Sequence, residues 1–369
     1  MPLSRFELFA ACPPGLEPVL LEEVREHGWS AAKRQPGGVS FTGSWPDIWR
    51  ANLLLRGASR ILVRLGCFRA PSLNVLHGAA KELPWSEFLR EGQAFHVEAA
   101  ARKSRIYHTG AAEERVAKAA AQPTGAEEAA GEGLKVLVRI DGNEARVSVD
   151  SSGELLHRRG FKESVAGAPL RETMASLFLR AAGYDPSLPL LDPFCGSGTT
   201  LIEAAEMAAG LAPGRGRRFA FQNFASFRPD AYDRARTKAL ACTVRGTGPI
   251  VGSDRAKGAI EAAVANAERA GAADRVALMV REVSRIEPPE GPPGLILTNP
   301  PYGKRLSAGR ELEPLYAAFG GVLRERFAGW RVALITESDR LAKATGLKLE
   351  PGPPVPHGGL KVRLWQGTV

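Results

Sequence analysis

The chain has 369 residues, of which 44% are hydrophobic and 24% charged, as in ordinary folded proteins. No apolar run reaches the roughly 18–20 residues that cross a bilayer, and this composition also excludes a collagen and a mainly disordered chain. The N-terminus carries charges within its first ten residues and so lacks the apolar stretch of a signal peptide. We therefore expect a cytoplasmic protein, and the length predicts two or three domains.

The charge balance is basic, with 49 Lys and Arg against 40 Asp and Glu and a net charge of +9. Most of the excess lies in the C-terminal half. A basic balance favours a polyanionic partner such as nucleic acid, and the alternative is a surface that is basic without a dedicated partner. The four cysteines are far apart and the six histidines are scattered, so we expect neither a bound metal nor a disulfide framework.

The first 158 residues alternate short helices with antiparallel strands, which predicts small α+β units. The clearest feature is a hairpin around Asp141-Gly142-Asn143, where two alternating runs flank a turn sequence. In chain order, we expect a helix over 14–27, a strand over 37–41, a helix starting at Ser44, strands over 61–66 and 94–100, a helix over 103–121, a loop over 122–133 and the hairpin over 134–153.

After about residue 158, strands alternate with helices, which predicts a parallel, doubly wound sheet. We expect strands over 189–192, 249–254, 275–280, 294–301 and 330–336, helices over 199–209, 256–271 and 311–327, and a last edge strand over 361–366.

The first chemical motif is Asp192-Pro193-Phe194-Cys195-Gly196-Ser197-Gly198-Thr199, between a short strand and a helix. Glycines there let the backbone turn sharply and approach a ligand, either a nucleotide or the amino-acid end of S-adenosylmethionine (SAM). No GK[ST] sequence follows, so the motif is not a P-loop. Cys195 is a possible nucleophile, but its place inside the glycine loop argues against that role.

Acidic residues end the next two strands. Asp254, after Gly252-Ser253, is placed to bind ribose hydroxyls, and Glu282 to accept a hydrogen bond from an adenine amino group, unless it is simply a solvated loop residue. The long interval between Asp192 and Asp254 predicts an insertion over 206–248. Its basic segment 213–218 is either an RNA contact or part of a packing insertion.

The third motif, Thr298-Asn299-Pro300-Pro301-Tyr302-Gly303, ends the fourth strand. An exocyclic amino group on a base is a poor nucleophile because its lone pair is delocalised into the ring. The Asn299 side-chain oxygen and the Pro300 carbonyl can accept its two hydrogens, and Tyr302 can stack on an extruded base. No strong general base is needed, because positioning and electrostatics supply most of the catalysis.

With these motifs, DPFCGSGTTLIEAA and TNPPYGKRL, the chain resembles the THUMP-domain class I RNA methyltransferases. The segment ACPPGLEPVLLEEV is similar to their ferredoxin-like opening, and ANLLLRGASRILVRLG and RKSRIYHTGAAEERVAKA resemble their THUMP domain. The resemblance implies a Rossmann-like C-terminal domain after α+β ferredoxin-like and THUMP domains. The implied boundaries are 1–44 for the ferredoxin-like segment, 45–157 for the THUMP domain, and 158–369 for the linker and the methyltransferase domain.

The likeness is greatest to the RlmL type, which implies formation of N2-methylguanosine in 23S rRNA; TrmN-like enzymes methylate the same atom in tRNA. We expect no fused second methyltransferase domain and therefore no formation of 7-methylguanosine. Glu282 stands where relatives often have Asp. The expected catalytic residues are Asn299, Pro300 and Tyr302; the expected SAM-binding residues are Asp192, Phe194, Gly196, Gly198, Thr199, Ser253, Asp254, Glu282 and Asn299; the expected RNA contacts are Arg102, Lys103, Arg105, Arg215, Arg217 and Arg218.

Two alternatives remain open. Adenine-N6 DNA methyltransferases also use NPPY, but they carry a different recognition domain. A ribosome-assembly factor that binds RNA without catalysis would not need SAM, so cofactor binding discriminates that class. We expect a monomer by default.

Overall fold

The computed structural model describes residues 5–161, 170–241, 243–303 and 312–369. Contacts divide the chain into two compact units. The first contains residues 1–12, 24–156 and 217–239, and the second contains residues 13–23, 157–216 and 240–369. The chain thus changes unit between residues 156 and 157, whereas no division falls between residues 44 and 45.

The first unit is built on one eight-stranded sheet. Strand β4 (Arg60–Arg69) lies at its centre. Residues 60–64 of β4 pair with β1 (Phe6–Ala11) and residues 62–69 pair with β8 (Glu144–Asp150), with a bulge between Arg64 and Gly66. The predicted hairpin is confirmed, and Gly142 at its turn has a φ of 63°. The strand order is β2 (Lys33–Gln35), β3 (Gly38–Gly43), β1 (Phe6–Ala11), β4 (Arg60–Arg69), β8 (Glu144–Asp150), β7 (Leu134–Asp141), β5 (Ala94–Arg102) and β6 (Glu127–Glu128).

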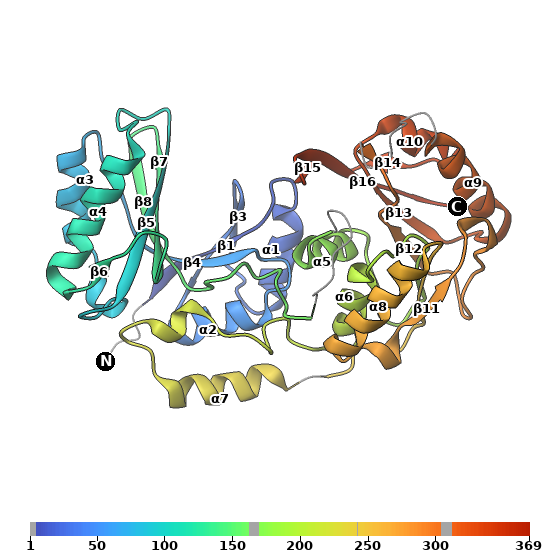
Figure 1. Cartoon of the computed structure of the whole chain (residues 1–369), viewed down its shortest axis with the longest axis horizontal. Helices are drawn as coiled ribbons and strands as arrows, with labels where there is room; N and C mark the ends of the chain where they lie inside the picture. The colour runs from blue at the N-terminus through green and yellow to red at the C-terminus, as the bar shows by residue number, and fades with distance from the viewer. Residues whose placement is uncertain (1–4, 162–169, 242, 304–311) are drawn as a thin grey trace. The chain divides into compact units, whose positions relative to one another are not determined.

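Helices α3 (Leu73–Lys81) and α4 (Thr109–Thr124) pack together beside β5, as Figure 1 shows. Helix α2 (Trp45–Leu54) starts after Ser44, as predicted, with Asp47 completing a capping box. The prediction of a helix from residue 103 is wrong at its start, since α4 begins at Thr109. Lys103 has a left-handed φ of 51° and Ser104 Oγ accepts the Ile106 amide, so the chain makes a turn there.

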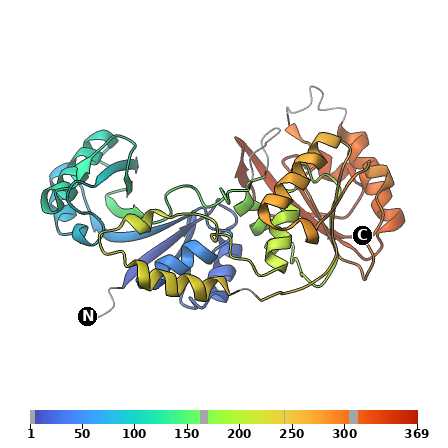
Figure 2. The same ribbon diagram turned by 60° about the horizontal axis from the view of Figure 1, so that its bottom comes forward.

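The insertion between α6 (Thr199–Ala208) and β10 (Ile250–Asp254) contributes residues 217–239 to the first unit. It forms a short 3₁₀ helix, η2 (Ala220–Asn223), and helix α7 (Pro229–Leu240), which lies beside α2 in Figures 1 and 2. Tyr232 of α7 meets the Trp49 ring at a centroid distance of 5.8 Å and the Phe221 ring at 5.2 Å. This part of the insertion therefore packs on the N-terminal fold through aromatic contacts.

The second unit has the expected doubly wound sheet, with β9, β10, β11, β12 and β13 parallel. The strand predicted over 361–366 is real but is not the edge, because β16 lies antiparallel between β13 and β14. The order is β11 (Ala277–Val280), β10 (Ile250–Asp254), β9 (Leu190–Asp192), β12 (Leu295–Thr298), β13 (Arg331–Thr336), β16 (Leu360–Thr368) and β14 (Glu350–Pro351), with β15 (Val355–His357) pairing β16.

Helices cover both faces of this sheet. The chain runs from β9 outward to β10 and β11, but from β12 in the opposite direction to β13, so right-handed crossovers place the connecting helices on opposite faces. The carboxyl ends of β9, β10 and β12 meet at this reversal of strand order, where open α/β sheets bind ligands. The helices are α5 (Glu172–Ala181), α6 (Thr199–Ala208) and α8 (Lys257–Ala270) on one face, and α9 (Leu312–Arg326) and α10 (Asp339–Ala344) on the other (Figure 1).

Helix α1 (Glu17–Glu26) begins in residues assigned to the second unit and ends in the first. In the parts of the chain that are described, no helix combines the length and the apolar character needed to cross a bilayer.

Candidate functional site

The loop that follows β9 turns sharply at two glycines. Gly196 has a φ of 52°, and Gly198, which caps α6, has a φ of 83°. A residue with a Cβ atom strains the backbone in this left-handed region, which explains why both places carry glycine. The Gly196 amide donates to Asp254 Oδ2 at 3.2 Å, which ties the loop to the end of β10.

Asp192 fixes the start of this loop through hydrogen bonds of its side chain. Its side chain is 2% exposed, and its Oδ1 accepts the Phe194 amide at 3.1 Å and the Thr298 hydroxyl at 2.7 Å. Burial raises the pKa of Asp192 to about 7, although both hydrogen bonds act to lower it. The carboxyl group therefore links the glycine loop to the strand that leads into Asn299.

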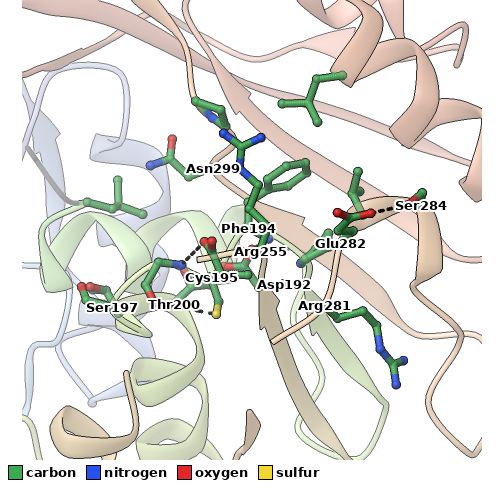
Figure 3. Close-up of a pocket in the computed structure, with 18 of the residues that line it drawn as sticks. Asp192, Phe194, Cys195, Ser197, Thr200, Arg255, Arg281, Glu282, Ser284 and Asn299 are labelled. Carbon is green, nitrogen blue, oxygen red and sulfur yellow. Dashed lines mark hydrogen bonds between the residues drawn. The ribbon is translucent and has the colours of Figure 1, made fainter. Parts of the chain in front are cut away.

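Two further carboxylates lie at the neighbouring strand ends. Asp254 is half-buried, and its Oδ1 accepts the Ala256 amide at 2.9 Å. Glu282 follows β11 by two residues and is exposed, and the Ser284 hydroxyl donates to its Oε2 at 3.5 Å (Figure 3). A carboxylate has about four acceptor positions, so both groups keep the capacity to bind a ligand's hydroxyl or amino groups.

These strand ends surround a cavity of about 660 Å³ (Figure 3). Its volume falls in the range of pockets that hold cofactors and drug-sized ligands. Seven of the residues predicted to bind the cofactor line the cavity: Asp192, Phe194, Gly196, Thr199, Asp254, Glu282 and Asn299.

Asn299 differs from the other polar residues of the cavity in its hydrogen bonding. Its Oδ1 atom is buried from solvent and meets no hydrogen-bond donor within the part of the chain that the structure describes. An unpaired buried acceptor costs free energy unless a ligand supplies a donor. Figure 3 shows Asn299 and Glu282 on opposite sides of the Phe194 ring. The cavity thus has acidic side chains on one side and, on another side, the unpaired hydrogen-bond acceptor Asn299 Oδ1.

Tyr302 differs from the expectation of an open stacking surface. Its ring is 2% exposed and does not line the cavity, so this arrangement offers no free face to a base. The neighbouring Pro301 does line the cavity, and its carbonyl accepts the Tyr316 hydroxyl at 3.2 Å. Pro300 is buried at the same turn. The loop is therefore packed against α9, which holds its backbone in place.

Two predicted cofactor residues support the loop without lining the cavity. Gly198 caps α6, and the Ser253 carbonyl accepts the Cys195 amide at 3.0 Å while the Ser253 side chain is 1% exposed. Burial raises the pKa of the Cys195 thiol, with the nearby Asp192 adding to the effect. A reactive cysteine needs a lowered pKa, so this environment opposes the nucleophile alternative.

Sequence reasoning missed several residues that line the cavity. Arg255 and Arg281 directly flank the two predicted acids, so their position in sequence could have indicated them. Leu312, Leu315 and Ala318 lie on α9, where no motif marks them, and Leu170 precedes α5. Only the fold brings these apolar groups to the site.

The predicted RNA contacts fall into two groups. Arg215 donates to Glu206 Oε1 at 2.6 Å and to the Ala270 carbonyl at 2.9 Å, and Arg217 donates to the carbonyls of Glu154 and Leu155. These contacts favour the packing interpretation of the insertion for both arginines. Exposed positions are taken by Arg218 and by Arg102, Lys103 and Arg105.

Comparison with known families agrees with this architecture. Residues 159–350 match the family described as the RMKL-like methyltransferase domain, residues 7–62 match the RlmL ferredoxin-like domain, and residues 70–150 match the THUMP domain. The first match ends inside β14, so it contains every residue that lines the cavity.

Individual relatives give the same result. A ribosomal RNA large subunit methyltransferase K/L of Methylococcus capsulatus is 34% identical over 99% of this chain and 51% of its own length. A putative RNA methyltransferase of Synechocystis is 32% identical over 96% of this chain and 95% of its own. The chain spans about half the length of the K/L relatives that it matches.

Among solved structures, a putative methyltransferase complexed with SAH superposes with a TM-score of 0.89 and 28% identity. The superposition covers 100% of this chain and 99% of that structure.

Proposed function

Because the chain belongs to the family of RMKL-like methyltransferases and carries RlmL ferredoxin-like and THUMP domains, we propose that it methylates RNA at the N2 amino group of a guanine in 23S rRNA. SAM is the cofactor of this fold. The observation that carries the proposal is Asn299 Oδ1, an unpaired acceptor at the cavity.

The residues around the cavity fit SAM. The glycine loop leaves room for close backbone approach, Asp254 is placed for the ribose hydroxyls, and Glu282 for the adenine amino group. Phe194 packs edge-on against Phe319 at a centroid distance of 5.7 Å, which fixes its ring at the cavity wall. When bound, SAM supplies an electrophilic methyl group, and all other steps use groups of the protein and the substrate.

The amino group of the base is activated by its hydrogen-bond acceptors. Asn299 Oδ1 accepts one N–H and the Pro300 carbonyl the other, which returns electron density to nitrogen and aims its lone pair. The Asp192–Thr298 hydrogen bond holds the strand immediately before Asn299 at a fixed place relative to the cofactor loop. As the N–C bond forms, the bond between the methyl group and the sulfur of SAM would break. The methylated nitrogen then carries a positive charge and would release its proton to water, so no strong base is required.

The substrate assignment has separate support. Several relatives are named as methyltransferases of the large ribosomal subunit RNA, and the THUMP match covers residues 70–150. The choice of guanine N2 follows from the RlmL resemblance, because an Asn-Pro-Pro-Tyr loop suits any exocyclic amino group. Tyr302 would stack on the target base only after its ring becomes uncovered.

The test is methyl transfer to defined RNA. Purified protein is incubated with tritiated SAM and either protein-free 23S rRNA or total tRNA from cells that lack the gene, and labelled nucleosides are separated after digestion. Label in N2-methylguanosine from 23S rRNA supports the proposal in full. The same nucleoside from tRNA keeps the mechanism and changes the substrate. SAM binding without methyl transfer to 23S rRNA, tRNA or a ribosomal precursor contradicts the proposed reaction. If the protein does not bind SAM, the non-catalytic RNA-binding factor is favoured.

A further inference from the structure

The loop between β5 and α4, residues 102–108, displays an aromatic side chain among cations. Tyr107 is 74% exposed, the highest value among the large hydrophobic side chains that are described. Isolated apolar groups on a surface are ordinary, so exposure alone indicates nothing. The rest of this loop is what makes Tyr107 informative.

The loop holds Tyr107 outward by construction. Ile106, the residue before it, is 4% exposed and anchors the loop in the first unit. The Ser104 hydroxyl accepts the Ile106 amide at 3.0 Å and closes a tight turn just ahead of the anchor. Tyr107 lies against the His108 ring at a centroid distance of 4.3 Å, so its position is supported from one side. A ring held this way is available for stacking with little loss of conformational freedom.

The backbone at this loop is also strained. Lys103 has a φ of 51°, the only positive φ at a non-glycine residue in the described chain. A left-handed lysine costs free energy, and such strain is kept where the surrounding structure requires a particular local shape. Here the shape reverses the chain after β5 and presents three exposed cations within four positions: Arg102, Lys103 and Arg105.

These cations are not neutralised by strong internal pairing. Arg102 meets Asp141 at 3.3 Å, but the two side chains are 75% and 53% exposed, so the pair contributes little. Lys103 and Arg105 are both exposed. The loop therefore combines exposed positive charge with an aromatic ring that is supported on one side.

We propose that residues 102–108 bind a single-stranded segment of RNA, with the Tyr107 ring stacking on an unpaired base and Lys103 and Arg105 contacting its phosphates. The proposal rests on the proposed function, since it takes RNA as the substrate. Proteins that bind single strands combine aromatic platforms with cationic tracks, because every base has a stackable face and every linkage a negative charge. A duplex hides its base faces, so the ring gives a preference for unpaired RNA.

The two contacts leave different signatures in binding. Full-length protein is titrated with a fluorescent single-stranded RNA and with a matched duplex, over a range of salt concentrations. Tyr107→Ala should weaken single-strand binding about tenfold and leave the salt slope unchanged. Tyr107→Phe keeps the ring and should bind as the wild type does. Duplex affinity should hardly change in either variant.

Removal of a cation should instead change the salt dependence of binding. Arg105→Gln and Lys103→Asn should each reduce the slope of log K against log salt by about 0.7, the value for one phosphate contact on a single strand. Asn is used at 103 because it tolerates a left-handed backbone. Lys118→Gln removes an exposed cation from α4 outside the loop, and Val75→Ala trims an exposed apolar side chain on α3; both should leave binding unchanged.

The outcomes separate this proposal from the proposed function. Wild-type binding to single-stranded RNA that survives Tyr107→Ala unchanged overturns the loop assignment and leaves RNA methylation standing. Equal losses in Tyr107→Ala and Tyr107→Phe overturn the stacking role, because the ring alone should suffice. No measurable binding of any RNA by the wild type overturns both. Circular dichroism of each variant excludes unfolding as the cause of a loss.

Discussion

Asp192 and Thr298 are joined by a 2.7 Å hydrogen bond from the threonine hydroxyl to Asp192 Oδ1. Asp192 is the last residue of β9 and Thr298 the last of β12, and their exposures are 2% and 0%. One bond thus connects the beginning of the glycine loop with the residue directly before Asn299. The cofactor loop and the proposed acceptor for the amino group are held in one geometry by a single buried carboxyl group.

This carboxyl group predicts a pH dependence of stability. Burial raises the pKa of Asp192 from 3.8 to about 7. Between these values the folded protein holds a proton that the unfolded chain has released, so the free energy of unfolding falls as pH rises through this window. The slope is at most about 1.4 kcal/mol per pH unit. Asp192→Asn cannot titrate, and its urea-unfolding profile from pH 4.5 to 8 should lack this contribution.

Thr298→Val gives the matched comparison. The Thr298 hydroxyl acts to lower the pKa of Asp192 in the folded protein, so its removal should extend the fall in stability to higher pH, while the lower end of the window stays at the pKa of the unfolded chain. Wild type and Asp192→Asn profiles that run parallel across the window would contradict the assignment of the titration to Asp192.

The acceptor role of Asn299 predicts a loss of turnover. Asn299→Ala removes a polar group that acts on the developing charge, and single groups of this kind are worth about 10²–10³ in rate. Single-turnover transfer of a tritiated methyl group should fall by that factor. Asn299 also lines the cofactor cavity, so SAM affinity measured by calorimetry should fall as well, but far less than turnover, since the acidic groups proposed for the cofactor lie elsewhere in the cavity. Near wild-type turnover in this variant would exclude the mechanism.

The proposed contact between Glu282 and the cofactor can be tested by SAM binding alone, without RNA. Glu282→Gln removes the charge of an acceptor that lines the cavity, and SAM should bind about tenfold more weakly. Glu287→Gln is the control, because this exposed glutamate follows in the same loop but does not line the cavity. Equal affinities in the two variants would remove Glu282 from the cofactor site and favour a solvated role.

The parallel sheet and its motifs were predictable because each strand is short, apolar and followed by a distinctive sequence. Asp192 ends β9, Asp254 ends β10 and Asn299 directly follows β12. These three strands are neighbours in the sheet, so the strand order alone brings the three residues together at one edge. β16 was misplaced at the edge, since β14, its outer neighbour, has only two residues, Glu350 and Pro351, and no strand pattern.

Other features depend on tertiary contacts that no local pattern carries. The burial of Tyr302 follows from packing against the neighbouring elements, and a motif cannot state which face of a ring is covered. The start of α4 was predicted too early because residues 103–108 carry acceptable helix formers, whereas the actual turn depends on Lys103 adopting a left-handed backbone. The arginines of 213–218 read as a basic patch in sequence, yet two of the three donate to groups inside the protein.

Two arginines of the insertion should therefore differ in their contribution to the free energy of unfolding. Glu206 is 1% exposed, and Arg215→Ala would leave its carboxylate without the 2.6 Å partner. Breaking a fully buried pair costs about 3–5 kcal/mol, but the Arg215 side chain is 28% exposed, so we expect the free energy of unfolding to fall by a smaller amount, about 1–3 kcal/mol. Arg218→Ala, three residues on at an exposed position, should change it by less than about 0.5 kcal/mol. Urea unfolding of both variants measures the difference. If Arg215→Ala were as stable as Arg218→Ala and lost RNA affinity instead, the insertion would be an RNA contact and its internal hydrogen bonds would be incidental.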